Sequence, residues 1–272
     1  MELEFWGTRG TCPVSGRKTA GCGGNTACAS LAVSPEELII IDAGTGLRNL
    51  GRKLKESSRT ERLEIHLLLT HFHLDHVWGL PFFEPLYSDR TVVTFYADEE
   101  PEETERLLAS LMSRRLFPLE FSELRSRRRF KTLPAGRMHL GGVDVSYQPL
   151  THPQGSVAYR LDGRHGSIVF ATDTEHPLKG ADEALIGFSR GAEHFVCDST
   201  YTPEEYEDGR RGWGHSTWEA GVKLAEAAGV KNLLLSHHNP DHDDRAVGGI
   251  VRRARRRFPR TQAAREGLKL RI

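Results

Sequence analysis

The sequence contains little cysteine and spaces it widely. Its 272 residues include four, none of them in a C-x-x-C pair: Cys12, Cys22, Cys28 and Cys197. Closely spaced cysteine pairs are typical of zinc ribbons, and dense sets are typical of disulfide-stabilised secreted domains. We therefore expect free thiols in a reducing cytosol, buried at Cys12, Cys22 and Cys28.

Long hydrophobic runs and an excess of one charge are also missing. The longest apolar stretches have the length of a strand, and the N-terminus has no basic region followed by a hydrophobic one. Lysine plus arginine and aspartate plus glutamate both number 37. We expect a soluble, cytoplasmic protein with no membrane partner, and the total charge predicts no preference for a polyanion.

The most distinctive feature is a group of three histidines and one aspartate. His71, His73, Asp75 and His76 directly follow the apolar run 67–69, which predicts a buried strand. Imidazole and carboxylate together suit zinc, manganese or iron, and a tight turn at a strand end can aim several such side chains into one cleft. A polar loop in which the histidines only cap or hydrogen-bond is the alternative. The density of ligands favours a metal site.

Predicted strands and helices are interleaved along the whole chain. Strands are expected at 3–6, 29–33, 38–42, 64–69, 92–96, 143–148, 157–161, 167–171, 194–197 and 232–235. Helices are expected at 102–112, at 217–228 with Ser216 as N-cap, and at 245–258. No linker appears, so residues 1–272 are predicted to form one α/β domain of two face-to-face sheets with helices outside.

Three more candidate ligands follow later strands. They are His152, Asp173 and His237. Taken singly, a histidine or aspartate at a strand end is usually a turn or cap residue. A catalytic dinuclear centre, however, needs about three or four protein ligands per ion, and an oxygen ligand shared between the ions. Their joint placement favours such a centre.

An ordered set of motifs resembles the metallo-β-lactamase superfamily, and specifically its phosphodiesterase branch. The set runs through W-G-T-R-G at 6–10, G-G-N-T at 23–26, I-D-A-G-T-G at 41–46, the histidine cluster, His152, Asp173, G-H-S-T at 214–217 and His237. The resemblance implies a four-layer αβ/βα sandwich. It also implies one ion held by His71, His73 and His152, and a second held by Asp75, His76 and His237.

The same resemblance implies roles for the remaining site residues. Asp173 would bridge the two ions together with a water or hydroxide, and a bridging aspartate argues against a lactamase, where a cysteine is common at this position. His215 in G-H-S-T looks like the histidine that reaches the scissile phosphate in transfer-RNA 3'-processing nucleases. The alternative is that G-H-S-T is only the loop that enters a helix, with His215 exposed to solvent. We predict Asp75 and His215 as catalytic residues, with two divalent ions, zinc first and manganese or iron as alternatives.

Other polar residues are candidates for orienting the ligands or reaching the substrate. Asp42, at the end of an apolar strand, is the best candidate for orienting a ligating imidazole, with Thr70 behind it. Asp198 and His238 could serve the same purpose or be structural. Arg9 and Asn25 could reach the cleft, although the glycine-rich neighbours equally suggest tight turns.

The choice of substrate depends on weaker signals. The N-terminal motifs look most like 3',5'-cyclic-nucleotide phosphodiesterases, so we predict hydrolysis of a small phosphodiester, with cyclic mononucleotides first. The basic segments 114–131 and 252–257 could contact nucleic acid, although the second also fits the solvated face of a helix. An RNA- or DNA-processing nuclease and a non-catalytic metal sensor are the alternatives. A homodimer is possible for this family.

Overall fold

The computed structural model describes residues 1–56 and 62–272. Within these residues, the strands form two sheets of seven. The first sheet has the spatial order β14 (Lys269–Arg271), β1 (Glu2–Gly7), β2 (Cys28–Ala32), β3 (Glu37–Ile41), β4 (Leu63–Leu68), β5 (Thr91–Ala97) and β6 (Arg127–Thr132). The second has the order β13 (Thr261–Ala263), β12 (Asn232–Ser236), β11 (His194–Asp198), β10 (Ser167–Ala171), β9 (Ser156–Asp162), β8 (Val143–Leu150) and β7 (Arg137–Leu140).

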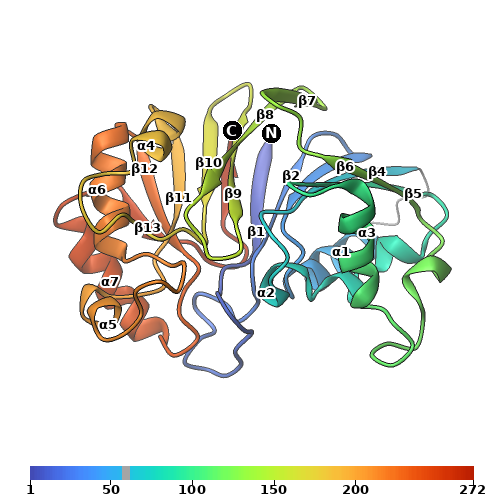
Figure 1. Ribbon diagram of the computed structural model, residues 1–272, viewed down its shortest axis with the longest axis horizontal. Helices are drawn as coiled ribbons and strands as arrows, with labels where there is room; N and C mark the ends of the chain where they lie inside the picture. The colour runs from blue at the N-terminus through green and yellow to red at the C-terminus, as the bar shows by residue number, and fades with distance from the viewer. Residues whose placement is uncertain (57–61) are drawn as a thin grey trace.

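Helices cover the outer face of each sheet, which produces four layers (Figure 1). The first sheet is covered by α1 (Leu47–Glu56) and α3 (Pro101–Ser110), and the second by α4 (Glu183–Ser189), α6 (Trp218–Ala228) and α7 (Asp244–Arg255). Short helices occupy the connections: α2 (Leu74–Val77), α5 (Pro203–Glu207), η1 (Leu80–Phe82), η2 (Glu84–Tyr87) and η3 (Phe121–Glu123). This layering is the arrangement expected from the sequence.

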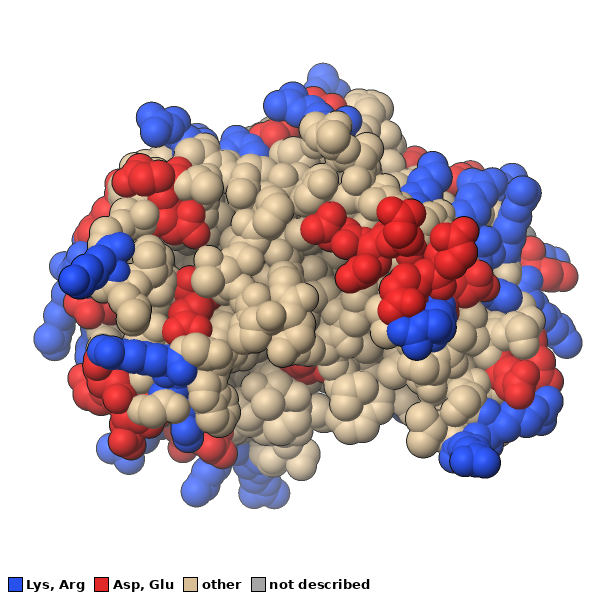
Figure 2. Space-filling view, viewed as in Figure 1, with Lys and Arg blue, Asp and Glu red and all other residues tan. Residues whose placement is uncertain are grey.

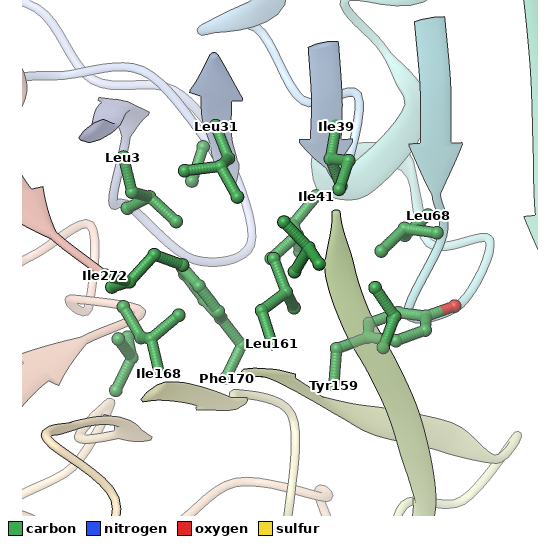
Figure 3. Packing of buried hydrophobic residues seen from close by; sticks show 14 of the residues in the cluster. Leu3, Leu31, Ile39, Ile41, Leu68, Tyr159, Leu161, Ile168, Phe170 and Ile272 are labelled. Carbon is green, nitrogen blue, oxygen red and sulfur yellow. The ribbon is translucent and has the colours of Figure 1, made fainter. Parts of the chain in front are cut away.

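The two sheets pack through an apolar layer between them. Figure 3 shows Leu31 and Ile39 of the first sheet facing Leu161 and Phe170 of the second. Burying one such side chain contributes about 1.5–3 kcal/mol, so this layer supplies much of the stability. Tyr159 of β9 also donates its hydroxyl to the carbonyl of Leu69 at 2.7 Å. This bond ties the end of β4 to the opposite sheet.

Strand direction explains where polar residues gather. Strands β3 to β6 run parallel, as do β10 to β13. In parallel sheets the carboxyl ends meet at one edge, which is where α/β proteins place their sites. Figure 1 shows α2 and the loop after β1 at this shared edge, between the two sheets.

The predicted strands and helices are present in the structure with small shifts at their ends, but the sequence predicted none of α1, α4, α5, β7, β13 and β14. Segment 127–132, most of which belongs to the basic segment 114–131, is the edge strand β6. The N-cap of α6 is Thr217, whose hydroxyl accepts from the amide of Ala220, and not Ser216. Cys12 is exposed, so the expectation of a buried thiol was wrong there, whereas Cys22 and Cys28 are buried. Among the described residues, no helix has the length and apolar character needed to cross a membrane.

Candidate metal centre

The predicted ligands converge because each follows a strand that ends at the same edge. His71 and His73 follow β4, His152 follows β8, Asp173 follows β10, and His237 follows β12. These four segments are far apart in sequence. The sandwich alone brings them together, into two adjoining clusters of side chains.

The tri-histidine cluster consists of His71, His73 and His152. One ring nitrogen from each lies within 4.8 Å of the others, with His71 buried, His152 half-buried and His73 exposed. Burial lowers the pKa of His71 well below its usual range, and burial lowers the pKa of His152 to about 4. Both rings are therefore neutral at pH 7, with lone pairs available for a cation.

The carboxylate cluster consists of Asp75, His76, Asp173 and His237, and all four are buried. His237 Nε2 lies 3.2 Å from Asp75 Oδ2 and 3.2 Å from Asp173 Oδ1. Burial opposes ionisation of both carboxyls, but the charges of His76 and His237 outweigh it and lower the pKa of each. Burial likewise opposes the charged form of His76, yet Asp173 and Asp75 raise its pKa well above the usual value.

Several buried polar atoms of these clusters lack a hydrogen-bond partner within the described part of the chain: His71 Nε2, His76 Nε2, both ring nitrogens of His152, and Asp173 Oδ2. An unpaired buried polar group costs about 1–3 kcal/mol. His76 Nε2 lies 3.2 Å from Asp173 Oδ2, but neither atom forms a hydrogen bond. Such a pair is typical of two ligands aimed at a common point.

The donor set therefore fits two divalent cations. Nitrogen and carboxylate ligands together suit zinc, manganese or iron, and the geometry does not choose among them. Asp173 connects the two clusters, since its Oδ1 lies 3.9 Å from His71 Nε2 and 3.2 Å from His237 Nε2. This placement matches the shared-ligand role expected for Asp173.

Asp42 lies where a residue that orients a ligand is expected. Its Oδ2 accepts from His76 Nδ1 at 2.8 Å, and its Oδ1 accepts from the amide and hydroxyl of Thr70 at 2.8 and 3.0 Å. Fixing Nδ1 in this way leaves Nε2 of His76 directed into the carboxylate cluster.

Asp198, at the end of β11 in the opposite sheet, holds the imidazole of His215 in a similar way. It is fully buried, and its Oδ2 accepts from His215 Nδ1 and from the amide of Asp173, both at 3.0 Å. Burial opposes the charged form of His215, but Asp198 outweighs burial and raises the pKa of His215 to about 9. The ring of His215 stacks on that of His237, with centroids 4.9 Å apart. His215 therefore borders the carboxylate cluster.

Backbone conformation adds a second signature of the site. Four residues other than glycine have a positive φ within the described chain, and all lie at this edge: Thr11 at 65°, Asp42 at 59°, Asp173 at 57° and His237 at 56°. Such conformations cost about 1–3 kcal/mol each and cluster at functional sites. The amide of Thr11 donates to Asp75 Oδ2 at 2.7 Å. Strain is thus concentrated in residues that form the centre.

The structure contradicts the expectation that Arg9 reaches the cleft, and for His238 it favours the structural alternative. Arg9 is fully buried, and its guanidinium donates to the carbonyls of Gly23, Asn239 and His242. It holds two loops together and does not reach the cleft. His238 donates Nε2 to the carbonyl of Ala264 at 2.9 Å, so it supports the backbone and not a ligand.

Asn25 is also structural. Its Nδ2 donates to both carboxylate oxygens of Glu266 at 3.1 Å, and its Oδ1 accepts from Thr45 at 3.0 Å. The amide is fully engaged in holding the glycine-rich loop. The tight-turn alternative for this motif was correct.

Two further residues, Thr200 and Glu175, support the site and were not predicted. Thr200 Oγ1 lies 3.0 Å from His237 Nδ1 and donates to Asp198 at 2.8 Å, so it fixes the ring of His237. Glu175 accepts from the amides of Gly212 and Gly214 at 2.7 and 2.9 Å, which anchors the loop that carries His215. The only signal in the sequence was that Thr200 lies two residues after Asp198, which ends a strand.

The basic segments make contacts of their own. Arg114 pairs with Glu123 at 2.8 Å, and Arg128 donates to the carbonyls of Leu124 and Ser126. In the second segment, Arg257 pairs with Glu219 and Glu226 of α6. These pairs reduce the charge that either segment offers to a nucleic acid.

A family model described as a beta-lactamase superfamily domain matches residues 38–238, which include all seven expected ligands. The chain belongs to the β-lactamase superfamily. The resemblance to this superfamily and the predicted four-layer sandwich are confirmed. Together with its similarity to ribonucleases, membership makes the protein a metal-dependent hydrolase.

Individual relatives of this hydrolase agree with the phosphodiesterase branch. Ribonuclease Z of Lacticaseibacillus casei (strain BL23) is 22% identical over 315 residues, covering 98% of this chain and 93% of that protein. Crystal structures similar in fold include YhfI from Bacillus subtilis, with a TM-score of 0.72 and 16% identity over 99% of this chain and 98% of that one. A diphosphatase of the PhnP family has a TM-score of 0.70 and 22% identity over 100% and 97% of the two chains.

Proposed function

We propose that this hydrolase cleaves phosphodiester bonds in RNA, using two divalent cations held by the tri-histidine and carboxylate clusters. One observation carries the proposal: His215, held by Asp198, borders two adjoining ligand clusters that meet at Asp173. Paired cations suit phosphoryl transfer because they neutralise the anionic ester. A lone imidazole beside them suits contact with a substrate oxygen.

The chain's own residues have distinct tasks in this reaction. Bound divalent cations would supply Lewis acidity and lower the pKa of a water molecule. Asp75 is kept ionised by the neighbouring His76, as a ligand requires. Asp198 occupies Nδ1 of His215, which leaves Nε2 for the substrate. From there His215 can hydrogen-bond a phosphoryl oxygen or donate a proton to the leaving oxygen.

RNA is favoured as substrate by the relatives. Ribonuclease Z proteins from several bacteria align with almost the whole chain, whereas cyclic nucleotides, our first expectation from the sequence, gain no support from these relatives. An RNA substrate makes binding sensitive to salt, because phosphate contacts release counterions.

A small phosphodiester, cyclic nucleotides included, is the second candidate. Figure 2 shows an uncharged band down the middle of one face, with acidic side chains gathered beside it over α3. The formal net charge is zero. The alignment with the Lacticaseibacillus ribonuclease spans 315 positions, more than the 272 residues of this chain, so that relative has segments without a counterpart here. The uncharged band, the zero net charge and the missing segments all suit a compact substrate.

A substrate panel tests the proposal. Protein reconstituted with zinc or manganese is assayed on bis(p-nitrophenyl) phosphate, cyclic AMP, cyclic GMP, a 3'-extended transfer RNA and a lactam. We expect cleavage of the first compound and of the RNA, with RNA binding that weakens as salt rises. Cleavage of cyclic nucleotides without RNA would select the second candidate. Hydrolysis of the lactam alone would refute phosphodiester chemistry.

A further inference from the structure

A short loop, residues 209–214, directly precedes His215. The amides of Gly212 and Gly214 both donate to the carboxylate of Glu175, at 2.7 and 2.9 Å. These two glycines have φ of 81° and 84°, in the left-handed region that other residues rarely adopt. All residues of the loop except Gly214 are exposed. The loop is therefore held in one conformation although most of it lies at the surface, as is typical of loops that bind ligands.

The loop touches the tri-histidine cluster. A Cβ atom added at Gly214 would lie 2.4 Å from Cδ2 of His152, so the backbone of Gly214 packs directly against that imidazole. The ring centroids of His152 and the exposed His73 are 4.9 Å apart. Because every side chain of the carboxylate cluster is buried, a substrate reaches the cations from the side of His73 and His152. The loop therefore borders the open side of the metal centre.

The loop carries an exposed indole. Trp213 lies between the two anchored glycines and is 56% exposed. The guanidinium carbon of Arg210 lies 4.8 Å from the centre of the indole ring. One face of the ring is thus covered by a cation, and the exposed remainder leaves the other face open. Aromatic rings with an open face are the surfaces on which unpaired bases stack, and arginine adds to such stacking.

Arg210 is available to an anion and lies near His215. It forms no ion pair with any described residue, whereas its neighbour Arg211 pairs with Glu207. Tyr201 connects Arg210 to the metal centre, because its ring packs edge-on against that of His215, with centroids 6.0 Å apart. Burial raises the pKa of Tyr201, and the charge of Arg210 opposes that rise, so the guanidinium acts on the tyrosine at short range. The loop thus brings a free cation and an open aromatic face to the same edge of the centre.

We infer that Trp213 and Arg210 form a nucleotide-contact site beside the metal centre, where Trp213 stacks on an unpaired base next to the bond that is cut and Arg210 pairs with a flanking phosphate. The inference rests on the proposed phosphodiesterase function and makes it more specific. A base within a duplex has no free face to offer, so the substrate must be single-stranded at the bond that is cut.

Three phosphodiesters with one leaving group test the stacking contact on the metal-loaded protein. They are the p-nitrophenyl esters of adenosine 5'-phosphate, methyl phosphate and hexyl phosphate. Trp213→Ala should raise KM for the adenosine ester by about tenfold, as the loss of one stacked base does, with kcat and the KM of the methyl ester unchanged. Trp213→Phe retains a ring and should retain most of the preference for adenosine. An equal change for adenosine and methyl esters, no change, or a fall in kcat alone would overturn the inference. A larger rise in KM for the hexyl ester would also overturn it, in favour of an acyl-chain contact.

Tryptophan fluorescence reports the same contact without hydrolysis. Adenosine monophosphate should quench the emission of the metal-loaded protein, and ribose 5-phosphate should not. The chain has four tryptophans, so variants must locate the quenching. Trp213→Phe should abolish it, and Trp6→Phe should retain it. Trp6 is the matched control, because Lys53 lies 4.9 Å from the centre of its ring. Quenching that persists in Trp213→Phe would refute the assignment.

A second phosphate isolates the contribution of Arg210. Adenosine 3',5'-bisphosphate has no diester bond, and it should bind the wild-type protein more tightly than adenosine monophosphate because Arg210 pairs with the additional phosphate. Arg210→Gln should abolish this difference in affinity. Arg164→Gln is the control, because Arg164 is exposed, forms no ion pair within the described chain, and lies on the turn before β10, at the opposite end of that strand from Asp173. An undiminished difference in Arg210→Gln would refute the role of Arg210.

Binding and turnover separate this inference from the proposed function. Quenching of Trp213 by adenosine monophosphate, without hydrolysis of any phosphodiester, would refute the proposed function alone. Hydrolysis of the p-nitrophenyl esters without quenching, and without a preference for the adenosine ester, would refute the nucleotide-contact site alone.

Discussion

The tri-histidine and carboxylate clusters adjoin each other and share the loop after β4, yet they differ in exposure and in charge. In the tri-histidine cluster, His73 is exposed to solvent, whereas each side chain of the carboxylate cluster is buried. Burial lowers the pKa of His71 and His152, while neighbouring carboxylates raise the pKa of His76. Similar ligands thus form one open, neutral site and one closed, charged site.

This difference shows how environment assigns different tasks to the same side chain. An imidazole among other imidazoles is a ready ligand, because it is already neutral. An imidazole between two carboxylates must first release a proton, so cation binding there competes with protonation. We therefore expect the open site to exchange its ion faster and the closed site to respond more strongly to pH.

The largest expected effect comes from removing the residue that joins the clusters. Asp173→Asn should lower phosphodiester hydrolysis by about 10,000-fold, since a weakened two-cation site forfeits several kcal/mol of transition-state stabilisation. Metal content, measured by mass spectrometry, should fall from two ions to one. Asp144→Asn is the control, because Asp144 is a partly exposed aspartate of β8 that pairs with His139 of β7. Full activity in Asp173→Asn would show that the clusters work independently.

A variant of His215 tests whether this residue, which borders the carboxylate cluster, acts in the reaction and not in metal binding. His215→Ala should lower turnover by about 1,000-fold, the usual loss on removing a proton donor, while both ions are retained. Kinetics and metal analysis on one preparation measure the loss of turnover and the retention of both ions. Loss of an ion in this variant would make His215 a ligand, and unchanged turnover would remove it from the reaction.

The residues that orient the ligands should affect only their own cluster. Asp42→Asn should lower the affinity of the carboxylate cluster for its ion by about 10- to 100-fold, because Asp42 fixes the ring of His76. Gln154→Ala removes the exposed contact of His73 in the tri-histidine cluster and serves as the matched control, with little change expected. Competition with a chelator gives both affinities. A comparable loss in both variants would contradict the distinction between open and closed sites.

The smallest expected effect is a difference in pH dependence. The raised pKa of His76 keeps its ring protonated at neutral pH in the metal-free protein. Binding at the carboxylate cluster must release that proton, so affinity there should fall about tenfold for each pH unit lowered below this pKa. Burial lowers the pKa of His71 and of His152, so ion binding at the tri-histidine cluster should release fewer protons. Titration calorimetry in buffers of different ionisation enthalpy counts the protons, and equal release at both sites would contradict the assignment.

Contiguous features of the site were predictable, and distant contacts were not. The group from His71 to His76 could be recognised because its ligands lie within one turn and follow an apolar strand. Asp42 was recognisable for the same reason, at the end of another strand. Asp198 was only one candidate among several, because its partners His215 and Asp173 lie 17 and 25 residues away.

Arg9 shows how a local motif can predict a contact that the structure does not contain. An arginine in a glycine-rich N-terminal motif suggested a contact with an anionic substrate. In the structure its guanidinium binds the carbonyls of Asn239 and His242, more than 200 residues away in sequence. No local pattern reports such a contact, since the acceptors are backbone atoms that any residue type supplies.

The amino-acid sequence by itself determined the superfamily and the four-layer fold, and it predicted seven candidate ligands, because ordered motifs, local periodicity and residue type can be read along the chain. Only the tertiary structure decided which cluster is open and which carboxylate holds which imidazole. The physical reason is that burial and through-space charge set protonation and access, and both depend on neighbours that the fold brings from distant parts of the chain.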